Sequence, residues 1–428
     1  MMIPVLIISF VVLAVFSVPV ALAVGISVLI AVAFFTPFPT LGLVQRMVTG
    51  IDSFVLMAIP FFMLTGRLMN EGGITDRIFE FARCLVGPIR GGLAHANVLA
   101  SMIFAGMSGS AVADAGGLGM VEIKAMTDQG YRKEFAAAIT VASSTIGPII
   151  PPSIPMVIYG AMAEVSVGQL FLAGFLPGIL MGLSLMGMVY FLSFREYMPE
   201  DKRYRLVEIW HSFRKAFFPL LTPVILIGGI LSGIFTPTEA AAVSTIYAFV
   251  LSFVVYQTLR IKDIPSILID TFVTTAVVMF IISTTAGFSW LLIIGKIGKV
   301  LQEWVFSLTR SPWLVLLCIN VVLLFLGCLM EAGVLLILLT PIFVPMMNAM
   351  GVDLVHFGVI IVLNLMIGVA TPPVGMCLFV VSEANNIKLE RLIREMIPQV
   401  IPLILVLLVV TYFPDLVLWL PRWVMASR

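Results

Sequence analysis

The sequence predicts an all-α membrane protein that crosses the bilayer many times. Of its 428 residues, 61% are hydrophobic and only 11% are charged, whereas a soluble domain carries about 25% charged residues. A spanning helix needs roughly 20 apolar residues, so the chain has room for about ten. Apolar runs such as residues 5–16 do not alternate with polar residues, which excludes a transmembrane β-barrel. The net charge of +1 gives no reason to expect a nucleic-acid partner.

The N-terminal region, residues 1–51, is expected to supply scaffold helices. Residues 3–36 are apolar and contain Pro19, so they form either one spanning helix with a bend or two helices. No Lys or Arg precedes Arg46, so the basic region of a signal peptide is missing. We therefore expect residues 3–36 to remain in the mature protein.

Two amphipathic segments are expected on the membrane surfaces. Residues 72–90 combine apolar positions with three arginines, as in an interfacial helix that lies on the cytoplasmic surface. The most charged loop, residues 195–215, holds six Lys or Arg residues and is cytoplasmic by the positive-inside rule. Residues 295–310 resemble a counterpart of 72–90 on the opposite surface.

An internal repeat links the two halves of the chain. Gly106 precedes Pro151 by 45 residues, and Gly327 precedes Pro372 by the same number. The matching landmarks are Asp52 and Asp270, Gly106 and Gly327, Ile146-Gly147 and Ile367-Gly368, and Pro151-Pro152 and Pro372-Pro373. The spacing indicates duplicated structural units. We place the first repeat in 52–165, scaffold helices and the basic loop in 166–263, the second repeat in 264–385 and a C-terminal helix in 386–428.

Charge indicates that the two repeats are inverted. The loop after the first Gly-rich break carries Lys124, Arg132 and Lys133, while its counterpart, 347–357, has no Lys or Arg. The loop after the first Pro-Pro pair has none, while its counterpart, 384–395, has three. Because basic loops prefer the cytoplasm, the reversal predicts opposite orientations, the usual plan of secondary transporters.

Two Gly-containing pairs of short segments, 92–121 and 312–348, are predicted to be re-entrant helical hairpins. Each half has about 12–17 residues and gives roughly 18–25 Å of helix, less than the ~30 Å hydrocarbon core. One long tilted helix is the alternative for each pair. The glycines together with Ser108 and Ser110 favour a hairpin whose tip lies near mid-membrane.

Two further breaks, 143–152 and 367–375, are predicted within helices. Each contains a Pro-Pro pair, which we expect to begin the second half-helix because proline is tolerated in a first turn. A broken helix presents unpaired N–H groups on one side and free carbonyls on the other. The N–H groups suit a carboxylate. The carbonyls, with Ser and Thr hydroxyls, suit Na⁺.

Some acidic residues have both a functional and a structural interpretation. Asp114 and Glu331 are candidate intramembrane carboxylates, a type that is usually functional. Glu331 could instead only cap a helix, and Asp114 could be a structural partner for backbone donors. Glu239 closes the sequence Thr236-Pro237-Thr238-Glu239, which predicts a capping box.

An enzyme and a metal site are both disfavoured. Gly106-Met107-Ser108-Gly109 matches the GxSG stretch of rhomboid-like intramembrane serine proteases, but such a serine needs a histidine base within hydrogen-bond reach. No mid-membrane segment carries a histidine. The four cysteines form no CxxC pair and no HExxH is present, so we expect no metal centre.

Several long stretches resemble a known family, the large membrane subunit of tripartite ATP-independent periplasmic (TRAP) transporters, DctM type. They are FMLTGRLMNEGGI (62–74), FAAAITVASSTIGPIIPPSIPMVIYG (135–160), GIFTPTEAAAV (233–243), GCLMEAGVLLILLTPIFVP (327–345) and NLMIGVATPPVGMCLFV (364–380). At the second tip the family often has Asp where this chain has Glu331.

The resemblance implies a bacterial inner-membrane protein with an ion-transporter-superfamily-like architecture. It implies Na⁺-driven import of organic acids such as sialic acid or C4-dicarboxylates, with an elevator motion of the hairpins and broken helices against a scaffold. It also implies two partners, a small four-helix membrane subunit, expected here as a separate chain, and a periplasmic substrate-binding protein. A stand-alone Na⁺/dicarboxylate symporter of similar architecture is the alternative.

These expectations combine into a site hypothesis with Na⁺ as coupling ion and no other cofactor. Sodium is expected at Ser108, Gly109, Ser143 and Gly147, and again at Gly327, Glu331, Gly368 and Thr371. Substrate is expected at Ser110, Thr145, Gly333, Pro152 and Pro373. Structural roles are expected for Thr236, Glu239 and Asp114. The sequence leaves the substrate open.

Overall fold

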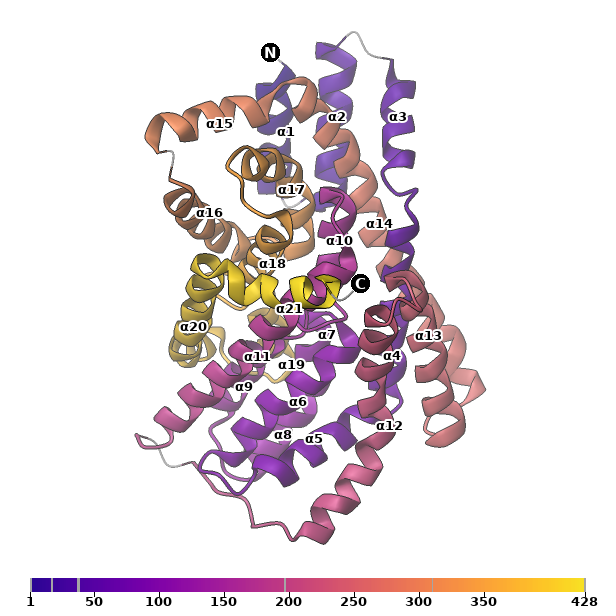
Figure 1. The fold of residues 1–428 in the computed structure, drawn as a ribbon, viewed down its shortest axis with the longest axis vertical. Helices are drawn as coiled ribbons and strands as arrows, with labels where there is room; N and C mark the ends of the chain where they lie inside the picture. The colour runs from indigo at the N-terminus through magenta and orange to yellow at the C-terminus, as the bar shows by residue number, and fades with distance from the viewer. Residues whose placement is uncertain (1, 17, 37–38, 196–197, 310, 427–428) are drawn as a thin grey trace.

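The computed structural model describes residues 2–16, 18–36, 39–195, 198–309 and 311–426, and every regular element in these ranges is helical (Figure 1). The helices are α1 (Met2–Val15), α2 (Val20–Phe35), α3 (Thr40–Thr49), η1 (Phe54–Met57), α4 (Ala58–Glu71), α5 (Ile74–Val86), α6 (Gly92–Ser108), α7 (Ala111–Gly116), α8 (Leu118–Asp128), α9 (Lys133–Ser144), α10 (Ile154–Ala163), α11 (Val167–Leu192), α12 (Leu206–Leu231), α13 (Pro237–Val250), η2 (Leu251–Val255), η3 (Ile261–Asp263), α14 (Ile264–Ile294), α15 (Ile297–Leu308), α16 (Pro312–Gly327), α17 (Ala332–Ala349), α18 (Leu354–Val369), α19 (Met376–Ala384), α20 (Leu389–Tyr412) and α21 (Pro414–Ala426).

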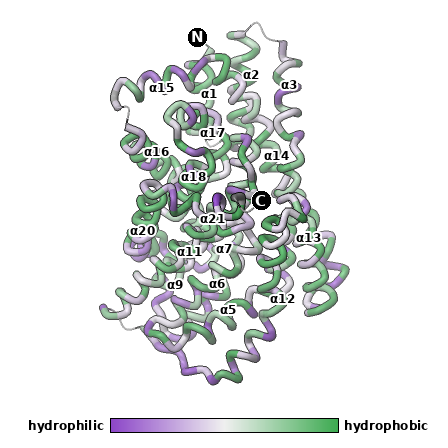
Figure 2. Tube along the Cα trace, viewed as in Figure 1, coloured by the Kyte–Doolittle hydropathy of each residue, from purple (hydrophilic) through white to green (hydrophobic). Residues whose placement is uncertain are grey.

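The spans agree with the predicted class. Among the described residues, seven helices are long and apolar enough to cross a membrane, or eight if one bent pair counts as a span. Most of the chain is apolar, and hydrophilic segments gather around α5 and the start of α12 at the lower end (Figure 2). Shorter apolar helices include α6, α10 and α18, which belong to the predicted hairpins and broken helices. The prediction of a helical multi-span membrane protein is therefore confirmed.

The N-terminal apolar region forms two helices. α1 and α2 have 14 and 16 residues and lie side by side, with Pro19 at the N-cap of α2. α2 leans against α14, where Gly25 faces Thr284. Since proline lacks an N–H and restricts the residue before it, the break near Pro19 separates two helices instead of bending one.

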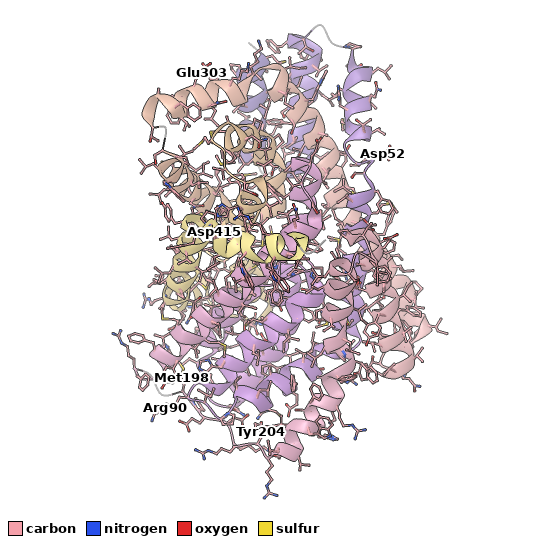
Figure 3. All side chains as sticks on the ribbon, viewed as in Figure 1. Asp52, Arg90, Met198, Tyr204, Glu303 and Asp415 are labelled. Carbon is pink, nitrogen blue, oxygen red and sulfur yellow. The ribbon has the colours of Figure 1, made fainter. Side chains whose placement is uncertain are left out.

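The two surface segments are helices at opposite ends of the molecule. α5 buries an apolar face that includes Ile74, Ile78 and Phe79, and it packs on α6 and α12. Arg90 and Tyr204 mark the lower end in Figure 3, whereas Glu303 of α15 marks the upper end. The helical prediction for both segments is confirmed.

The first predicted hairpin consists of α6 followed by α7 and α8. Gly109 takes the left-handed conformation (φ 61°) directly after α6, and Ser110 caps α7. The Tyr131 hydroxyl, just beyond α8, donates to the carbonyl of Pro199 at 2.8 Å. A Cβ on Gly91, just before α6, would lie 3.3 Å from Met198 Sδ. Both ends of this hairpin therefore meet the same loop.

The second predicted hairpin consists of α16 and α17, joined by residues 328–331. Near its start, Trp313 accepts a hydrogen bond from the Tyr412 hydroxyl at 3.5 Å. Just beyond its end, the carbonyl of Leu354 accepts a hydrogen bond from the Tyr159 hydroxyl at 2.8 Å. α15, which precedes α16, lies at the upper end (Figure 1).

The Pro-Pro pairs do not begin half-helices, so that prediction is wrong. α10 begins at Ile154, two residues after Pro152, and α19 begins at Met376. Ser153 caps α10 by accepting from the N–H of Met156 at 3.2 Å, and this hydroxyl satisfies a donor that the helix leaves free. Both Pro-Pro peptide bonds are cis and lie in the linkers.

Two basic loops lie together. Arg132 pairs with Glu395 at 2.8 Å and Arg391 pairs with Glu134 at 3.4 Å. The Lys133 ammonium also donates to the carbonyl of Asn385 at 2.5 Å. The start of α9 and the start of α20 therefore lie on the same side of the protein.

Candidate functional site

All four predicted breaks meet around one cavity of about 120 Å³. The first hairpin contributes Gly109 and Ser110, and the second contributes Glu331 and Gly333. The broken helices contribute Pro148, Ile154, Pro155, Met366, Val369 and Met376. We call this space the tip cavity. It brings together segments that are more than 200 residues apart in the sequence.

Gly109 is required at the first tip for two reasons. Its φ of 61° lies in the left-handed region, which side chains other than glycine rarely adopt. A Cβ at this position would also lie 2.7 Å from the carbonyl oxygen of Pro152. The tip therefore packs directly on the linker of the broken helix.

Two serines flank that glycine. Ser108 is buried, and its hydroxyl has no hydrogen-bond partner among the described residues. Ser110 accepts from the N–H of Ala113 at 3.4 Å and lines the tip cavity. A buried hydroxyl without a partner costs free energy, so Ser108 is available for a ligand.

Ser143 is held by a network away from the tip. Its hydroxyl donates to Asn97 Oδ1 at 2.7 Å and accepts from Ser101 at 3.1 Å. Asn97 Nδ2 in turn donates to Thr140 at 2.7 Å. The sequence analysis missed Asn97, Ser101 and Thr140, although residues four apart on a helix share a face.

Asp114 is a bare carboxylate. It is buried, and neither of its oxygens has a hydrogen-bond partner in the part of the chain that the structure describes. The prediction that it satisfies backbone donors is therefore wrong. A Cβ on Gly147 would lie 3.8 Å from Asp114 Oδ2 and 3.7 Å from the carbonyl oxygen of Ser110. Gly147, Asp114 and Ser110 thus lie together.

Glu122 is a second bare carboxylate, which the sequence analysis missed. It is fully buried in α8 and has no hydrogen-bond partner among the described residues. Burying an uncompensated charge costs several kcal/mol or more. Such a group must take up a proton or a cation. The sequence could have pointed to Glu122, because it is an acidic residue within a hairpin that was predicted to lie in the membrane.

The second predicted sodium group is brought together only in part. Glu331 and Gly333 line the tip cavity, and Glu331 makes no capping bond to α17. Gly327 and Gly368 instead touch through their backbones, since a Cβ on Gly368 would lie 2.7 Å from Gly327 Cα. Thr371 donates to the carbonyl of Ile367 at 2.6 Å. These last three residues do not line the cavity.

Three of the five predicted substrate residues lie outside the tip cavity. Thr145 is buried and donates to the carbonyl of Ala142 at 2.6 Å. Pro152 faces Gly109 through its carbonyl, and Pro373 is exposed in its linker. Only Ser110 and Gly333 of that set line the cavity.

A polar cluster that the sequence analysis missed joins the second hairpin to α18 and α20. Asn364 Nδ2 donates to Asn320 Oδ1 at 2.9 Å, and Asn320 Nδ2 donates to Thr411 at 2.8 Å. The other side-chain atom of Asn364, Oδ1, is buried without a partner among the described residues. The cluster ties the hairpin to the first half of its broken helix.

A second cavity of about 280 Å³, which we call the α4 cavity, lies between α4 and the first hairpin. Its lining includes Arg67, Asn70, Glu71 and Ser108. Met63, Ser110 and Ile154 line both this cavity and the tip cavity. Arg67 was not singled out in the sequence, although an arginine in an apolar helix is a signal in itself.

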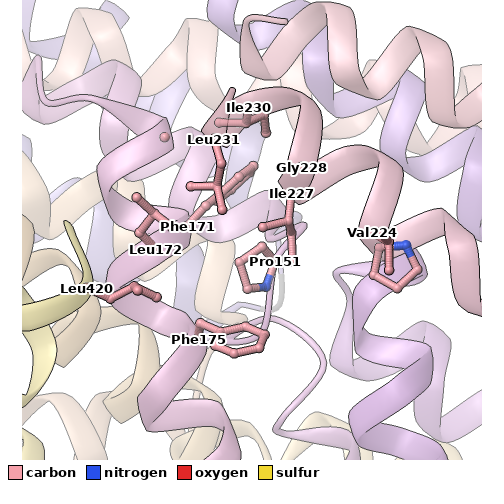
Figure 4. A pocket seen from close by; sticks show the side chains of 12 residues that line it. Pro151, Phe171, Leu172, Phe175, Val224, Ile227, Gly228, Ile230, Leu231 and Leu420 are labelled. Carbon is pink, nitrogen blue, oxygen red and sulfur yellow. The ribbon is translucent and has the colours of Figure 1, made fainter. Parts of the chain in front are cut away.

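A third cavity, of about 510 Å³, is apolar (Figure 4). It is lined by α11 and α12, by Leu420 of α21, and by Pro151 from the linker of the broken helix. With no polar side chain in its lining, it cannot orient a carboxylate, so it is separate from the candidate site.

The capping box at the start of α13 is confirmed. Glu239 accepts from the backbone N–H of Thr236 at 2.8 Å, and the Thr236 hydroxyl accepts from the N–H of Glu239 at 3.3 Å. The reciprocal bonds satisfy donors at the helix N-terminus.

The histidines do not activate Ser108. Ser108 has no hydrogen-bond partner among the described residues, and His356 Nε2 lies 2.8 Å from the carbonyl oxygen of Val410. His95 lies 13 residues from Ser108 on the same helix, roughly 20 Å along its axis. No group of His, Cys, Asp and Glu suited to a metal ion occurs in the described ranges.

Comparisons with known proteins agree with this architecture. The chain is 49% identical over 404 residues to the sialic acid TRAP transporter large permease protein SiaM of Vibrio cholerae, covering 93% of this chain and 94% of that protein. It is 41% identical over 401 residues to the C4-dicarboxylate TRAP transporter large permease protein DctM of Pseudomonas aeruginosa, covering 94% of each. Both relatives are named as permeases and not as enzymes.

A solved structure shares the fold. The crystal structure of the Alcanivorax borkumensis YdaH transporter matches with a TM-score of 0.62 and 15% identity over 87% of each chain. Residues 7–416 match the family described as tripartite ATP-independent periplasmic transporter, DctM component. The chain therefore belongs to the DctM family of large TRAP transporter permease proteins.

Proposed function

We propose that the protein is the large membrane subunit of a TRAP transporter that imports sialic acid with Na⁺ across the bacterial inner membrane. The observation that carries the proposal is the tip cavity, where two hairpin tips and two broken helices meet. Irregular backbone at membrane depth is tolerated where it lines a cavity, and such breaks expose N–H and C=O groups that can bind ions. The relative named for sialic acid supports this substrate.

The first sodium ion is proposed near the first tip. Gly147 lies beside Ser110 and Asp114, and Ser108 offers a buried hydroxyl without a partner among the described residues. Na⁺ binding there would compensate the charge of the buried Asp114 carboxylate. Gly109 contributes backbone, and Ser143 acts on this site through its bonds to α6.

The second sodium ion is proposed at the second tip. Glu331 supplies a carboxylate at the tip cavity, and the backbone carbonyls of Gly327 and Thr371 are the other candidates. The Gly368 carbonyl already accepts a hydrogen bond from the N–H of Thr371 at 2.9 Å. The substrate carboxylate is proposed beside Ser110 and Gly333, where Na⁺ offsets its repulsion from Glu331. Ligand pockets usually hold about 300–1,000 Å³, so the 120 Å³ cavity admits a carboxylate but must open for a whole sugar acid.

An inverted arrangement and an elevator motion are proposed for the whole unit. The first hairpin has both ends at the loop of Met198 and Pro199, while the ends of the second lie with Tyr159 and Tyr412. Asn97 and Asn364 bind each hairpin to its broken helix. This supports a transport domain that moves as one body, with a small membrane subunit and a periplasmic binding protein as partners.

Coupling to the membrane potential follows from the charges. Two Na⁺ with one monoanion carry one net positive charge inward. That movement gains about 2.3 kcal/mol per 100 mV, in addition to the sodium gradient.

The test is uptake of sialic acid by liposomes that contain this chain, its small subunit and its binding protein. An inward Na⁺ gradient should drive accumulation, and replacement of Na⁺ by K⁺ should abolish it. Equal accumulation with K⁺ contradicts sodium coupling. Uptake at full rate without the binding protein favours the stand-alone symporter.

A C4-dicarboxylate is the second candidate substrate, because a relative named for that substrate is 41% identical over nearly the whole chain. A thermal-shift screen of the binding protein against sialic acid and succinate separates the two. Stabilisation by succinate alone would replace sialic acid in the proposal.

A further inference from the structure

The α4 cavity adjoins the tip cavity, and it contains Ser108 and Ser110, which the proposed mechanism uses, together with Arg67, which it does not. It shares Met63, Ser110 and Ile154 with the tip cavity. Its wall carries a cation, Arg67, and the Ser108 hydroxyl, which is 3% exposed and has no hydrogen-bond partner among the described residues. A cation and a vacant donor in one wall are the chemistry that recognises a carboxylate.

Arg67 has N–H donors beyond those used by its two hydrogen bonds. Its Nη1 donates to Asp270 Oδ2 at 3.2 Å, and its Nη2 donates to Thr274 Oγ1 at 3.5 Å. A guanidinium has five N–H donors, so these two bonds leave others available. The side chains of Arg67 and Asp270 are 37% and 57% exposed, and such solvent-exposed pairs are weak. A second carboxylate can therefore share Arg67 or displace Asp270.

The surrounding charges keep such binding weak. Glu71 lines the same cavity, so a bound anion meets one cation and two nearby carboxylates, Glu71 and Asp270. Conduction requires binding that is favourable enough to enter and weak enough to leave. The α4 cavity therefore has the properties of a low-affinity release site and not of a high-affinity binding site.

The lining of the α4 cavity extends along α4 to the C-terminal end of that helix. α4 ends at Glu71, and α5 follows at the lower end of the molecule (Figure 1). Gly66 packs against Ser108, since a Cβ there would lie 3.2 Å from Ser108 Cα. The lining of the α4 cavity follows one face of α4, from Met63, which also lines the tip cavity, past Arg67 to Glu71, the last residue of the helix.

We propose that the α4 cavity is a release site in which Arg67 receives the carboxylate of the substrate as it passes Ser110 toward the α5 side. The inference rests on the proposed transport of an organic acid. A purely structural role for Arg67, as a tie between α4 and α14, is the competing explanation.

The experiment uses proteoliposomes that contain this chain, its small membrane subunit and its binding protein, with N-acetylneuraminate as probe. Exchange is measured while the concentration is varied on the α5 side. Arg67→Gln should raise the half-saturating concentration on that side roughly tenfold, the effect of losing one charged hydrogen bond. Arg67→Lys should have a smaller effect. Asp270→Asn should lower the half-saturating concentration, because it frees Arg67.

Two results would overturn the inference. Equal increases of the half-saturating concentration in Arg67→Gln and Asp270→Asn would show that the ion pair only joins α4 to α14. An unchanged half-saturating concentration in Arg67→Gln removes Arg67 from the route. Arg46→Gln, which removes an exposed arginine from α3, is the matched control.

A second measurement does not depend on transport. Ala113 lines the α4 cavity, and Ala113→Cys, in a background without the four native cysteines, can be labelled with anionic and cationic methanethiosulfonates. Arg67 should favour the anionic reagent, and Arg67→Gln should lower the ratio of the two rates. A ratio that does not change contradicts an anion site. If wild-type vesicles fail to exchange sialic acid while the ratio responds, the proposed substrate is wrong and the anion site stands.

Discussion

At the scale of single residues, Gly109 carries the strongest backbone requirement of the site. Its left-handed conformation and its contact with Pro152 both exclude a side chain. Gly109→Ala should destabilise the protein by about 1–3 kcal/mol and lower transport, as measured by thermal unfolding and sialic acid uptake. Gly187→Ala is the control, because a Cβ there meets nothing within 4 Å in a helix. Equal stability of the two variants would contradict this account.

Asp114 and Glu122 differ in what they face, although both are buried without partners among the described residues. Asp114 lies beside Gly147, where sodium is proposed. Asp114→Asn should raise the Na⁺ concentration for half-maximal uptake by about tenfold, since a charged contact is worth about 1.5–3 kcal/mol.

Glu122→Gln serves as the comparison for that measurement. The substitution replaces the buried carboxylate of Glu122 in α8 by an amide of similar shape. Glu122 is not among the proposed sodium ligands, so the sodium dependence of uptake should change much less than in Asp114→Asn. The reverse order of effects would move the proposed ion from Asp114 to Glu122.

At the scale of elements, α5 is held to the loop of residues 198–205 by a charged network. Arg83 Nε donates to Asp201 Oδ2 at 2.5 Å, and the Tyr204 hydroxyl donates to the same oxygen at 2.8 Å. Burial raises the pKa of Asp201, but the bonds from Arg83, Tyr204 and the N–H of Lys202 outweigh it and hold the pKa below its usual 3.8.

The sign of the pH effect follows from that depressed pKa. The network contributes its full stability above the unfolded pKa, and the contribution is lost as the pH falls through the lower folded pKa. Proteolysis of residues 198–205 should therefore not change between about pH 5 and 8. Asp201→Asn should expose the loop at neutral pH, and Glu200→Gln, in an exposed pair with Arg90, should not. Strong pH dependence near neutrality would contradict the assignment.

The broken helices show how local chemistry overrides a simple proline rule. Ser153 caps α10 and also donates to the carbonyl of Pro148, so the helix begins after the Pro-Pro pair. Pro155, one residue into α10, occupies the first turn instead. The sequence predicted the existence of the break, but the position of the helix start depended on the serine.

At the scale of the whole molecule, long-range polar bonds join the two repeats. The Tyr159 hydroxyl, from α10, donates to the carbonyl of Leu354 at the start of α18. Tyr159→Phe leaves that carbonyl without its donor and should cost about 1 kcal/mol, measured as a lower unfolding temperature. The sodium dependence of uptake should stay the same. Tyr190→Phe, at an exposed tyrosine, is the control, and equal unfolding temperatures would show that the bond contributes nothing.

The sequence by itself determined the class of protein, the four breaks and the spacing of the repeat. A run of apolar residues predicts a span, and glycine or proline alters the backbone conformation at its own position. Spans and interruptions such as Gly109 can therefore be predicted from a short stretch of sequence. The sequence also predicted that the two basic loops share the cytoplasmic side, because charge is counted loop by loop, but it did not predict the ion pair between Arg132 and Glu395.

Only the tertiary structure decided which side chains meet at the tip cavity. Ser143 lies in the last turn of α9, whereas Gly147 lies in the linker beyond that helix, so the two residues face different neighbours. The bare carboxylates of Asp114 and Glu122, and the cavity that joins Arg67 to Ser108, depend on how helices from separate parts of the chain are rotated and packed. No local pattern encodes that rotation, because it follows from the packing of the whole core.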